Sequence, residues 1–383
     1  MKKCIIISDS FKGSLSSGDI CDIAKESFQK IVPDCQLISI PVADGGEGTV
    51  ACFHEVCGGR EVTVTVQDPY GRDMKAAYLQ LEDGQAVIEM ASSAGLPLAS
   101  SCKDPRITST YGVGQQIRHA VEQGNKRILL GLGGSCTNDG GCGCAAALGV
   151  RFLDREGRSF IPVGGTLERI ERIDVSAARR LLRGVKITAM CDIDNPMHGP
   201  TGAAYVFGPQ KGADPAMVDF LDHRLKALDK TIQRELQLSV ADVPGSGAAG
   251  AFGAGILAFL GGTLCPGIEA VLDLVGFDEK LRDCDLVITG EGRFDSQSIR
   301  GKVISGVSRR AKARKVPVMV VAGSVSEEME SITGDPDSGI TAVFSINRQA
   351  MDYSESKKFS WRNYQYTLEN LLRLLRCAEC SGG

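Results

Sequence analysis

The chain opens with one pattern that occurs twice: a short apolar segment leads into a polar loop, and a helix follows. Residues 5–8 form a β-branched strand, and a helix begins at Ser16 or Ser17, where Ser16 and Asp19 have the spacing of a capping box. Residues 36–42 form a second strand, which runs into a glycine-rich loop and a short helix. Successive strand–loop–helix units predict a parallel sheet covered by helices.

A different periodicity follows in the middle of the chain. Residues 61–66 alternate between apolar and polar types, and residues 76–81 and 86–90 are strand-like on either side of short turns. These three segments predict an antiparallel meander. A helix near 112–122 and a strand over 127–132 are expected next.

The strand–helix alternation returns after residue 283. Apolar strands are expected at 286–289, 316–322 and 341–345, and a helix over 302–313. The last helix is predicted to carry one apolar stripe, formed by Trp361, Tyr364, Leu368, Leu371 and Leu375.

With 383 residues, the chain is longer than one hydrophobic core usually grows, so we expect two domains. Two N-terminal strands and three C-terminal strands suggest a discontinuous, flavodoxin-like (Rossmann-like) parallel-sheet domain of residues 1–60 and 283–383. An inserted α/β domain, residues 61–282, is predicted to interrupt it and to carry a glycine-rich phosphate loop. The active site is expected in the cleft between them.

Charge and cysteine usage narrow the class of protein. The net charge is −4, which disfavours a nucleic-acid partner, and the first apolar run is too short for a signal peptide or a membrane span. The 14 cysteines lie in a large chain without a secretory signal, so we expect reduced thiols rather than disulfides or a zinc site. These features predict a cytoplasmic protein without a membrane partner.

Polar residues gather in three loops that follow predicted strands. Ligands of open parallel sheets bind beyond the carboxyl ends of the strands, so loops that converge there predict a site. The alternative is that these residues only cap the helices that follow. The loop residues are Asp9, Ser10 and Lys12 after the first strand, Asp44, Gly45, Gly46 and Glu47 after the second, and Glu291, Arg293 and Asp295 after the third.

A glycine-dense loop over residues 131–143 (GLGGSCTNDGGCG) follows an apolar strand and opens a helix. Its backbone N–H groups could hold phosphate without obstruction by side chains. The alternative is a tight turn whose glycines pack a helix on a sheet. Its candidate phosphate-binding residues are Gly133, Gly134, Ser135, Thr137, Asn138 and Asp139. Neither the Walker A sequence nor the dinucleotide-binding glycine spacing is present.

Residues 191–196 (CDIDNP) follow a strand expected at 185–190 and place carboxylates beside the amide of Asn195. Mg²⁺ on a nucleotide is usually bound by one or two carboxylates, so Asp192 and Asp295 are our candidates for metal binding and catalysis. An acidic turn before Pro196 and a helix cap are the alternatives.

Three cations lie in glycine-flanked loops, where they could hold a carboxylate or a phosphate. They are Lys12, Lys211 and Arg293. The alternative is that all three are exposed surface charges. A second glycine-rich stretch, residues 245–255, could also bind an anion, but its small residues favour close packing.

Taken in order along the chain, these segments resemble the glycerate kinase family, which includes bacterial enzymes of glyoxylate and of galactarate or glucarate catabolism. The segments that carry the resemblance are 9–15 (DSFKGSL), 41–49 (PVADGGEGT), 131–140 (GLGGSCTNDG), 191–196 (CDIDNP), 207–213 (FGPQKGA) and 288–297 (ITGEGRFDSQ). Phe11, Gly13 and Cys136 depart from residues that are common in the family, but none of these departures removes a charge on which the expected mechanism relies.

The resemblance implies a kinase that uses ATP and Mg²⁺ to phosphorylate D-glycerate, as a monomer or homodimer. The expected product is 2-phosphoglycerate, with 3-phosphoglycerate as the alternative. The mechanism we expect places the triphosphate on the glycine loops, balances charge with Lys12 or Arg293, and positions the glycerate hydroxyl with an aspartate, Asp192 or Asp295. A nicotinamide-dependent oxidoreductase and a non-catalytic ligand sensor remain as rival hypotheses.

Overall fold

The computed structural model describes residues 1–42, 48–99, 103–296, 298, 302–333 and 335–381. The chain divides into two compact units. Unit 1 consists of Met1–Ala43 and Ile268–Gly383, and unit 2 of Asp44–Gly267.

The divisions between the units lie N-terminal to both boundaries proposed from the sequence, near residues 60 and 282. Helix α2 (Thr49–Cys57) follows the strand β2 and was expected to cover the same sheet. It packs instead on β4 and β5 of unit 2. At the other boundary, α10 (Gly267–Leu274) packs on α12 of unit 1, where a Cβ at Gly306 would lie 2.9 Å from Ile268.

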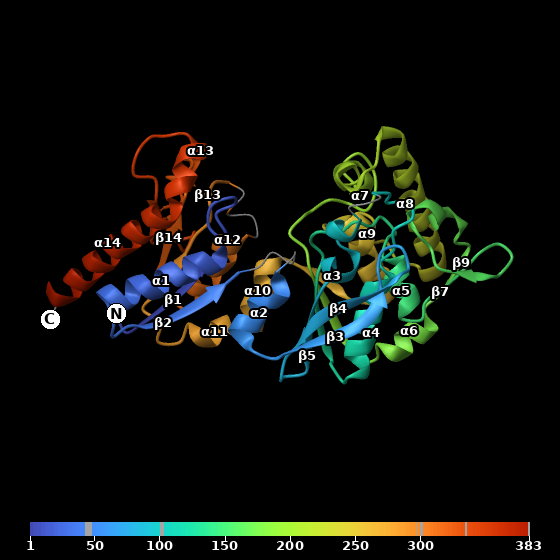
Figure 1. Ribbon diagram of the computed structural model, residues 1–383, viewed down its shortest axis with the longest axis horizontal. Helices are drawn as coiled ribbons and strands as arrows, with labels where there is room; N and C mark the ends of the chain where they lie inside the picture. Colours follow the sequence, from blue (N-terminus) through green and yellow to red (C-terminus); the bar gives the residue numbers. More distant parts are fainter. Residues whose placement is uncertain (43–47, 100–102, 297, 299–301, 334, 382–383) are drawn as a thin grey trace. The chain divides into compact units, whose positions relative to one another are not determined.

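Unit 1 is built on a five-stranded parallel sheet in the order β2-β1-β12-β14-β16. Numbered along the unit, this is the 2-1-3-4-5 order of a flavodoxin-like sheet. Figure 1 shows the blue N-terminal strands beside the orange C-terminal strands. The strands are β1 (Lys3–Ser8), β2 (Gln36–Pro41), β12 (Leu286–Thr289), β14 (Val318–Ala322) and β16 (Ala342–Ser345).

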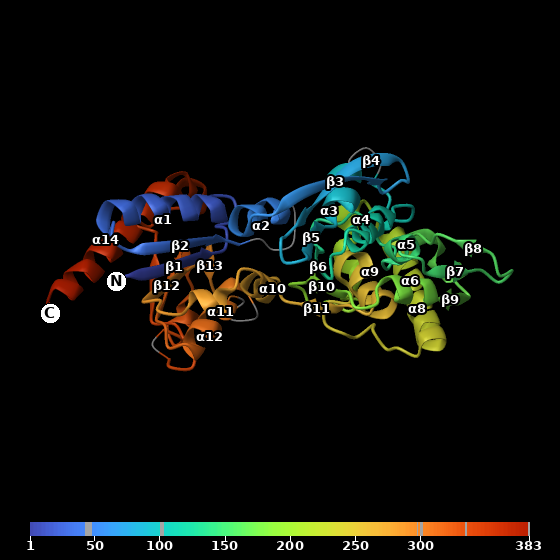
Figure 2. The same ribbon diagram turned by 90° about the horizontal axis from the view of Figure 1, so that it is seen from below.

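Helices cover both faces of this sheet. In Figure 2, α1 and α14 lie on one face and α11 and α12 on the other. Tyr364, Leu368 and Leu371 of α14 form the buried part of the predicted apolar stripe and pack in the core with α1, but Trp361 is 41% exposed, so its place in the stripe was wrong. The remaining elements of unit 1 are α1 (Ser17–Ile31), α11 (Phe277–Lys280), β13 (Arg293–Phe294), α12 (Val303–Ala313), β15 (Ser324–Val325), α13 (Tyr353–Ser356) and α14 (Ser360–Ser381).

Unit 2 contains a six-stranded mixed sheet in the order β11-β10-β6-β5-β4-β3. The predicted meander is present, because β3, β4 and β5 are antiparallel neighbours, whereas β5, β6, β10 and β11 run parallel. Apolar residues of β5, β6 and β10 form the centre of its core. The strands are β3 (Arg60–Gln67), β4 (Asp73–Gln80), β5 (Gln85–Glu89), β6 (Arg127–Gly131), β10 (Lys186–Met190) and β11 (Thr263–Cys265).

Two further parts of unit 2 were not anticipated, a small sheet in the order β8-β7-β9 and the long helix α8. The strands of the small sheet are β7 (Arg151–Leu153), β8 (Ser159–Phe160) and β9 (Arg172–Asp174). Besides α2, unit 2 contains the helices α3 (Ala91–Ala94), α4 (Tyr111–Glu122), α5 (Cys142–Ala147), α6 (Ser176–Leu181), α7 (Ala203–Phe207), α8 (Pro215–Leu236) and α9 (Ala248–Gly255).

The glycines of residues 245–255 serve close packing, which was the favoured interpretation of that stretch. A Cβ at Gly250 would lie 2.1 Å from the carbonyl oxygen of Thr137, and one at Gly255 would lie 2.3 Å from that of Gly140. The stretch therefore packs directly on the backbone of the first glycine loop. Among the described helices, none has the length and apolar character needed to cross a bilayer.

Candidate active site

In unit 1, the loops after β1 and β12 lie side by side at the carboxyl end of the sheet. The N–H of Asp9 donates to the carbonyl oxygen of Gly290 over 2.9 Å, and the Ser8 hydroxyl donates to the same oxygen over 2.9 Å. In a flavodoxin-like sheet, the gap between these two strands is the topological switch point, where ligands bind. The structure therefore brings two of the three predicted loops together.

Close backbone packing fixes the loop that carries Glu291. A Cβ at Gly290 would lie 1.9 Å from the carbonyl oxygen of Val321, and one at Gly292 would lie 3.2 Å from the Cα of Phe11. Only glycine fits at position 290 without displacing β14. The loop is thus held between the segment after β1 and the segment after β14.

Glu291 is the acidic side chain of this edge whose hydrogen-bonding capacity is least satisfied. It is 8% exposed, and its Oε1 is buried without a hydrogen-bond partner in the described structure. Burial raises the pKa of Glu291, the charges of Asp9 and Asp295 raise it further, and a hydrogen bond with Ser298 and the charge of Lys302 lower it. The charges of Asp9 and Asp295 therefore act on Glu291 at this partly buried edge.

The two other charged residues of the third loop are more accessible. Asp295 is 24% exposed at its side chain, and its Oδ2 lies 3.6 Å from the Nε of the exposed Arg293. The backbone N–H of Asp295 donates to the Ser298 hydroxyl over 2.9 Å. The Asp295 carboxylate thus borders the cluster where a substrate can reach it.

In the first loop, the Asp9 carboxylate accepts a hydrogen bond from the N–H of Ser10 over 2.7 Å, which fixes the turn. The side chain of Lys12 is exposed, and its carbonyl oxygen accepts a hydrogen bond from the Tyr353 hydroxyl. Lys12 can therefore move its ammonium group while its backbone stays anchored. The residues of the second loop, Asp44, Gly45, Gly46 and Glu47, lie outside the described residues.

In unit 2, the glycine loop is accessible only at its start. Gly134 is exposed and has a φ of +72°, a left-handed conformation that favours glycine. For the N–H groups of Gly133, Gly134 and Ser135, no acceptor is found in the described part of the chain. Consecutive free N–H groups in such a turn form a concavity that binds anions.

The far end of the same loop has no accessible N–H groups of this kind among the described residues. Asp139 is fully buried and accepts hydrogen bonds from the N–H and hydroxyl of Thr110, both over 2.8 Å. It also accepts from the N–H groups of Gly141 and Gly143 over 3.0 and 3.2 Å. These donors begin α5, so in this structure the N–H groups at this helix terminus donate to Asp139.

Thr137 and Asn138 are also inside unit 2. Both are 0% exposed, and the Oγ1 of Thr137 and both amide atoms of Asn138 have no hydrogen-bond partner among the described residues. Their burial places them beneath the accessible turn rather than on it. Direct contact with a substrate would require this part of the loop to move.

Lys211 is neither an exposed charge nor an accessible ligand group, although those were the two interpretations offered by the sequence. It is 2% exposed, and its Nζ donates to the carbonyl oxygen of Thr137 over 2.6 Å. Burial lowers the pKa of Lys211 to about 8, while the charges of Cys136 and Asp139 act in the opposite direction. The lysine therefore stabilises the buried end of the glycine loop.

The 191–196 segment is held by its own hydrogen bonds. The Oδ1 of Asp192 accepts from the N–H of Gly267 over 2.7 Å, and the amide of Asn195 donates to the Thr201 carbonyl oxygen over 2.8 Å. Asp192 is exposed, so it stays accessible to a ligand. No group of three or more His, Cys, Asp or Glu side chains suited to a metal is found among the described residues. The predicted metal ligands, Asp192 and Asp295, belong to different units.

Sequence reasoning missed several residues that complete these sites. Ser298 and Lys302 act on Glu291, and Thr110 supplies two of the donors to Asp139. Thr110 lies far from Asp139 along the chain and has no local motif, so no signal could have identified it. Lys302 was expected only as the first residue of the helix predicted over 302–313.

Comparison with known proteins extends these observations over the whole chain. The model of the glycerate kinase family matches residues 4–376. The chain is 42% identical over 378 residues to a glycerate kinase of Bacillus cereus (strain ATCC 10987 / NRS 248), with 98% of both proteins covered. It is 43% identical over 346 residues to the glycerate 2-kinase of Escherichia coli (strain K12), with 90% of each covered. A crystal structure named for glycerate kinase 2 of Salmonella typhimurium LT2 superposes with a TM-score of 0.84 at 40% identity, with 99% of both chains covered.

Proposed function

The chain belongs to the glycerate kinase family, and we propose that it transfers the γ-phosphoryl group of ATP to the C2 hydroxyl of D-glycerate, forming 2-phosphoglycerate and ADP. A relative of 43% identity that is named a glycerate 2-kinase supports the choice of hydroxyl. The single observation that carries the assignment in this structure is the pairing of the loops after β1 and β12, which brings Asp9, Glu291 and Asp295 to the switch point of unit 1.

The acidic cluster fits the cation that accompanies ATP. Glu291 has a buried oxygen without a hydrogen-bond partner among the described residues, and its two carboxylate neighbours oppose its ionisation. Asp295 would contribute one carboxylate to Mg²⁺ bound to the phosphates of ATP, since such an ion usually has one or two protein carboxylates, and Asp192 is the alternative ligand. When bound, the ion neutralises charge on the transferred phosphoryl group.

Asp295 is the residue that positions the attacking hydroxyl and accepts its proton. Its side chain is accessible, whereas Glu291 is enclosed. A carboxylate beside the exposed Arg293 and near Glu291 can orient a hydroxyl group for in-line attack. Lys12 and Arg293 supply positive charge for the glycerate carboxylate or the phosphates.

Unit 2 contributes the accessible turn of its glycine loop. The N–H groups of Gly133, Gly134 and Ser135 would hold phosphate oxygens of ATP. Residues of both units therefore take part in the reaction under this proposal. A substitution at Asp295 in unit 1 or at Gly134 in unit 2 should then reduce turnover.

The test is ³¹P NMR of the purified protein with MgATP and D-glycerate. We expect the signal of 2-phosphoglycerate together with that of ADP, and no product from L-glycerate. A 3-phosphoglycerate signal would retain the kinase and correct the hydroxyl that is attacked. Unchanged ATP in the presence of D-glycerate would contradict the substrate assignment.

A further inference from the structure

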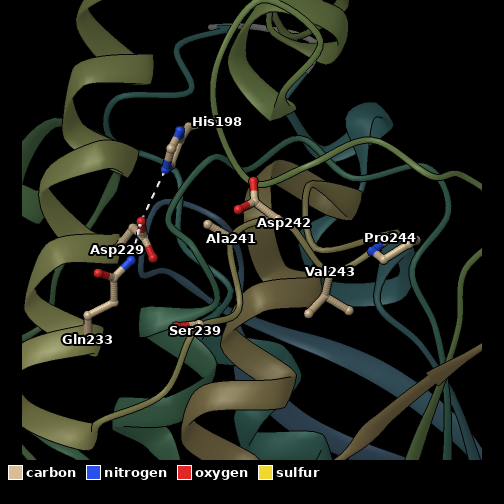
Figure 3. Close-up of a pocket in the computed structure, with 8 residues that line it drawn as sticks. All are labelled: His198, Asp229, Gln233, Ser239, Ala241, Asp242, Val243 and Pro244. Carbon is tan, nitrogen blue, oxygen red and sulfur yellow. Dashed lines mark hydrogen bonds and ion pairs between the residues drawn. The ribbon is translucent and has the colours of Figure 1, made fainter.

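A pocket of about 430 Å³ lies in unit 2 between α8 and the segment that follows it. Figure 3 shows eight residues around it, which come from the loop after β10, from α8 and from residues 239–244. Its volume is in the range of small-molecule sites. The proposed reaction uses none of these residues.

One side of the pocket is a hydrogen-bonded set centred on Asp229. The Oδ2 of Asp229 lies 3.2 Å from the Nε2 of His198 and accepts a hydrogen bond from the Nε2 of Gln233 over 2.9 Å. The Asp229 side chain is only 9% exposed, and its Oδ1 has no hydrogen-bond partner among the described residues. A buried carboxylate oxygen that lacks a partner is costly unless a ligand supplies a donor.

These contacts settle which atoms remain for a ligand. With the Nε2–H of His198 directed at Asp229, the neutral ring keeps a lone pair on Nδ1, which is an acceptor. The amide N of Gln233 is used on Asp229, so its carbonyl oxygen is also an acceptor. This side of the pocket therefore offers acceptors and almost no donors.

The opposite side adds a second carboxylate and an apolar wall. Asp242 is exposed, and its carboxylate points toward the His198–Asp229 pair in Figure 3. Ala241, Val243 and Pro244 provide apolar surface beside it. No lysine or arginine is among the described residues that line the pocket. The pocket is thus negative, rich in acceptors and partly apolar.

We propose that this pocket binds a small aliphatic amine, whose ammonium group lies between Asp229 and Asp242 and whose methylene groups contact Val243 and Pro244. An ammonium group carries three donors and no acceptor, which complements the acceptors that line the pocket. A bare divalent cation fits less well, because no group of three or more metal-binding side chains is found in the described structure. The apolar wall also favours a methylene chain over a hydrated ion.

The experiment is a titration of the full-length protein with 1,4-diaminobutane at constant pH and ionic strength, followed through the imidazole ¹⁵N signals. The chain has four histidines, and the His198→Gln variant assigns the signal of interest. We expect a saturable shift of the His198 signal and no shift of His54, His119 or His223. The uncharged analogue 1,4-butanediol should leave all four unchanged.

Two matched variants test the role of charge. Asp242→Asn should weaken binding of the diamine about tenfold, the effect of losing one charge-assisted hydrogen bond. Asp73→Asn removes the same charge from an exposed position on β4 and should leave the affinity unchanged. Because Asp242 is exposed, its substitution does not threaten the fold.

Three results would overturn the proposal: no saturable His198 shift, an equal shift with the diol, or equal affinity in the Asp242→Asn variant. A blocked lysine, Nα-acetyl-lysine methylamide, separates the two sources of an alkyl ammonium group. Tighter binding of the blocked lysine than of the diamine would overturn the small-molecule assignment in favour of a protein side chain.

Discussion

Two glycine-flanked acidic loops look alike in the sequence and differ sharply in the structure. Asp139 in unit 2 is buried and accepts four hydrogen bonds near Lys211, although burial still raises its pKa. Glu291 in unit 1 is also buried, but the charges of Asp9 and Asp295 raise its pKa further, and one of its oxygens has no hydrogen-bond partner among the described residues. The first arrangement stabilises a loop, and the second awaits a ligand.

The comparison separates two uses of the same residue types. A buried charge that is matched by donors contributes to stability, and its removal leaves an uncompensated partner. A charge held among like charges costs stability in the free protein and is retained for function. Substitutions in unit 1 should therefore change turnover, and substitutions around Asp139 should change stability.

The largest effect is expected from Asp295→Asn in unit 1. Loss of a group that positions the hydroxyl and accepts its proton should lower kcat by about 10³-fold. The unfolding free energy should change by no more than about 0.5 kcal/mol, because Asp295 is accessible. A coupled assay of ADP release measures kcat, and urea denaturation measures the unfolding free energy. Asp22→Asn on α1 is the control, and normal turnover of Asp295→Asn would remove this residue from the mechanism.

The next effect is on stability in unit 2. Lys211→Met removes the buried donor to the Thr137 carbonyl oxygen. We expect the unfolding free energy to fall by about 2 kcal/mol in urea denaturation, the cost of leaving a buried acceptor without its donor. The exposed Lys230→Met on α8 is the matched control and should stay near the parent value. Equal stability of both variants would mean that Lys211 does not stabilise the loop.

A smaller effect should appear in the pH dependence of stability. Burial lowers the pKa of Lys211 to about 8, whereas the unfolded chain holds this proton up to about pH 10.4. Between these values the unfolded state binds more protons, so stability rises with pH, by at most about 1.4 kcal/mol per pH unit from this group. Denaturation at pH 7.5 to 10 should show this rise in the parent. Lys211→Met should lack it, and parallel curves would refute the assignment.

The smallest effect tests the anion-binding turn. Gly134 has a φ of +72°, and a Cβ there would meet only Ala91 at an ordinary 3.5 Å, so Gly134→Ala should cost about 1 kcal/mol of backbone strain. The shifted N–H groups should raise KM for ATP by about fivefold. Gly157→Ala, at a φ of +77° with no neighbour within 4 Å, imposes the same strain elsewhere. An equal KM in both variants would exclude a phosphate contact at Gly134.

Elements governed by local patterns were predictable from the sequence. The capping box of Ser16 and Asp19 is present at the start of α1, and the strands of the two large sheets, apart from β11, lie close to their expected positions. Proximity of the first and third loops also followed from the sheet order. The prediction that Trp361 belongs to the buried stripe was wrong, because the spacing of apolar residues along a helix does not determine how wide the covered face is.

The burial of Asp139 and Lys211 could not be predicted from local sequence patterns. Their burial depends on Thr110, on the 245–255 stretch and on other segments that are distant in sequence. Likewise, α2 follows β2 in the chain yet packs on β4 and β5. Long-range packing of this kind has no signature in a single local motif.

The order of strands in unit 1 has a consequence for synthesis on the ribosome. β1 lies between β2 and β12, so its second neighbour is made only after all of unit 2. At about 5–20 residues per second, β1 waits on the order of tens of seconds for that partner. Unit 2 is continuous and can complete its core meanwhile, which leaves an apolar edge of the nascent chain for chaperones to shield.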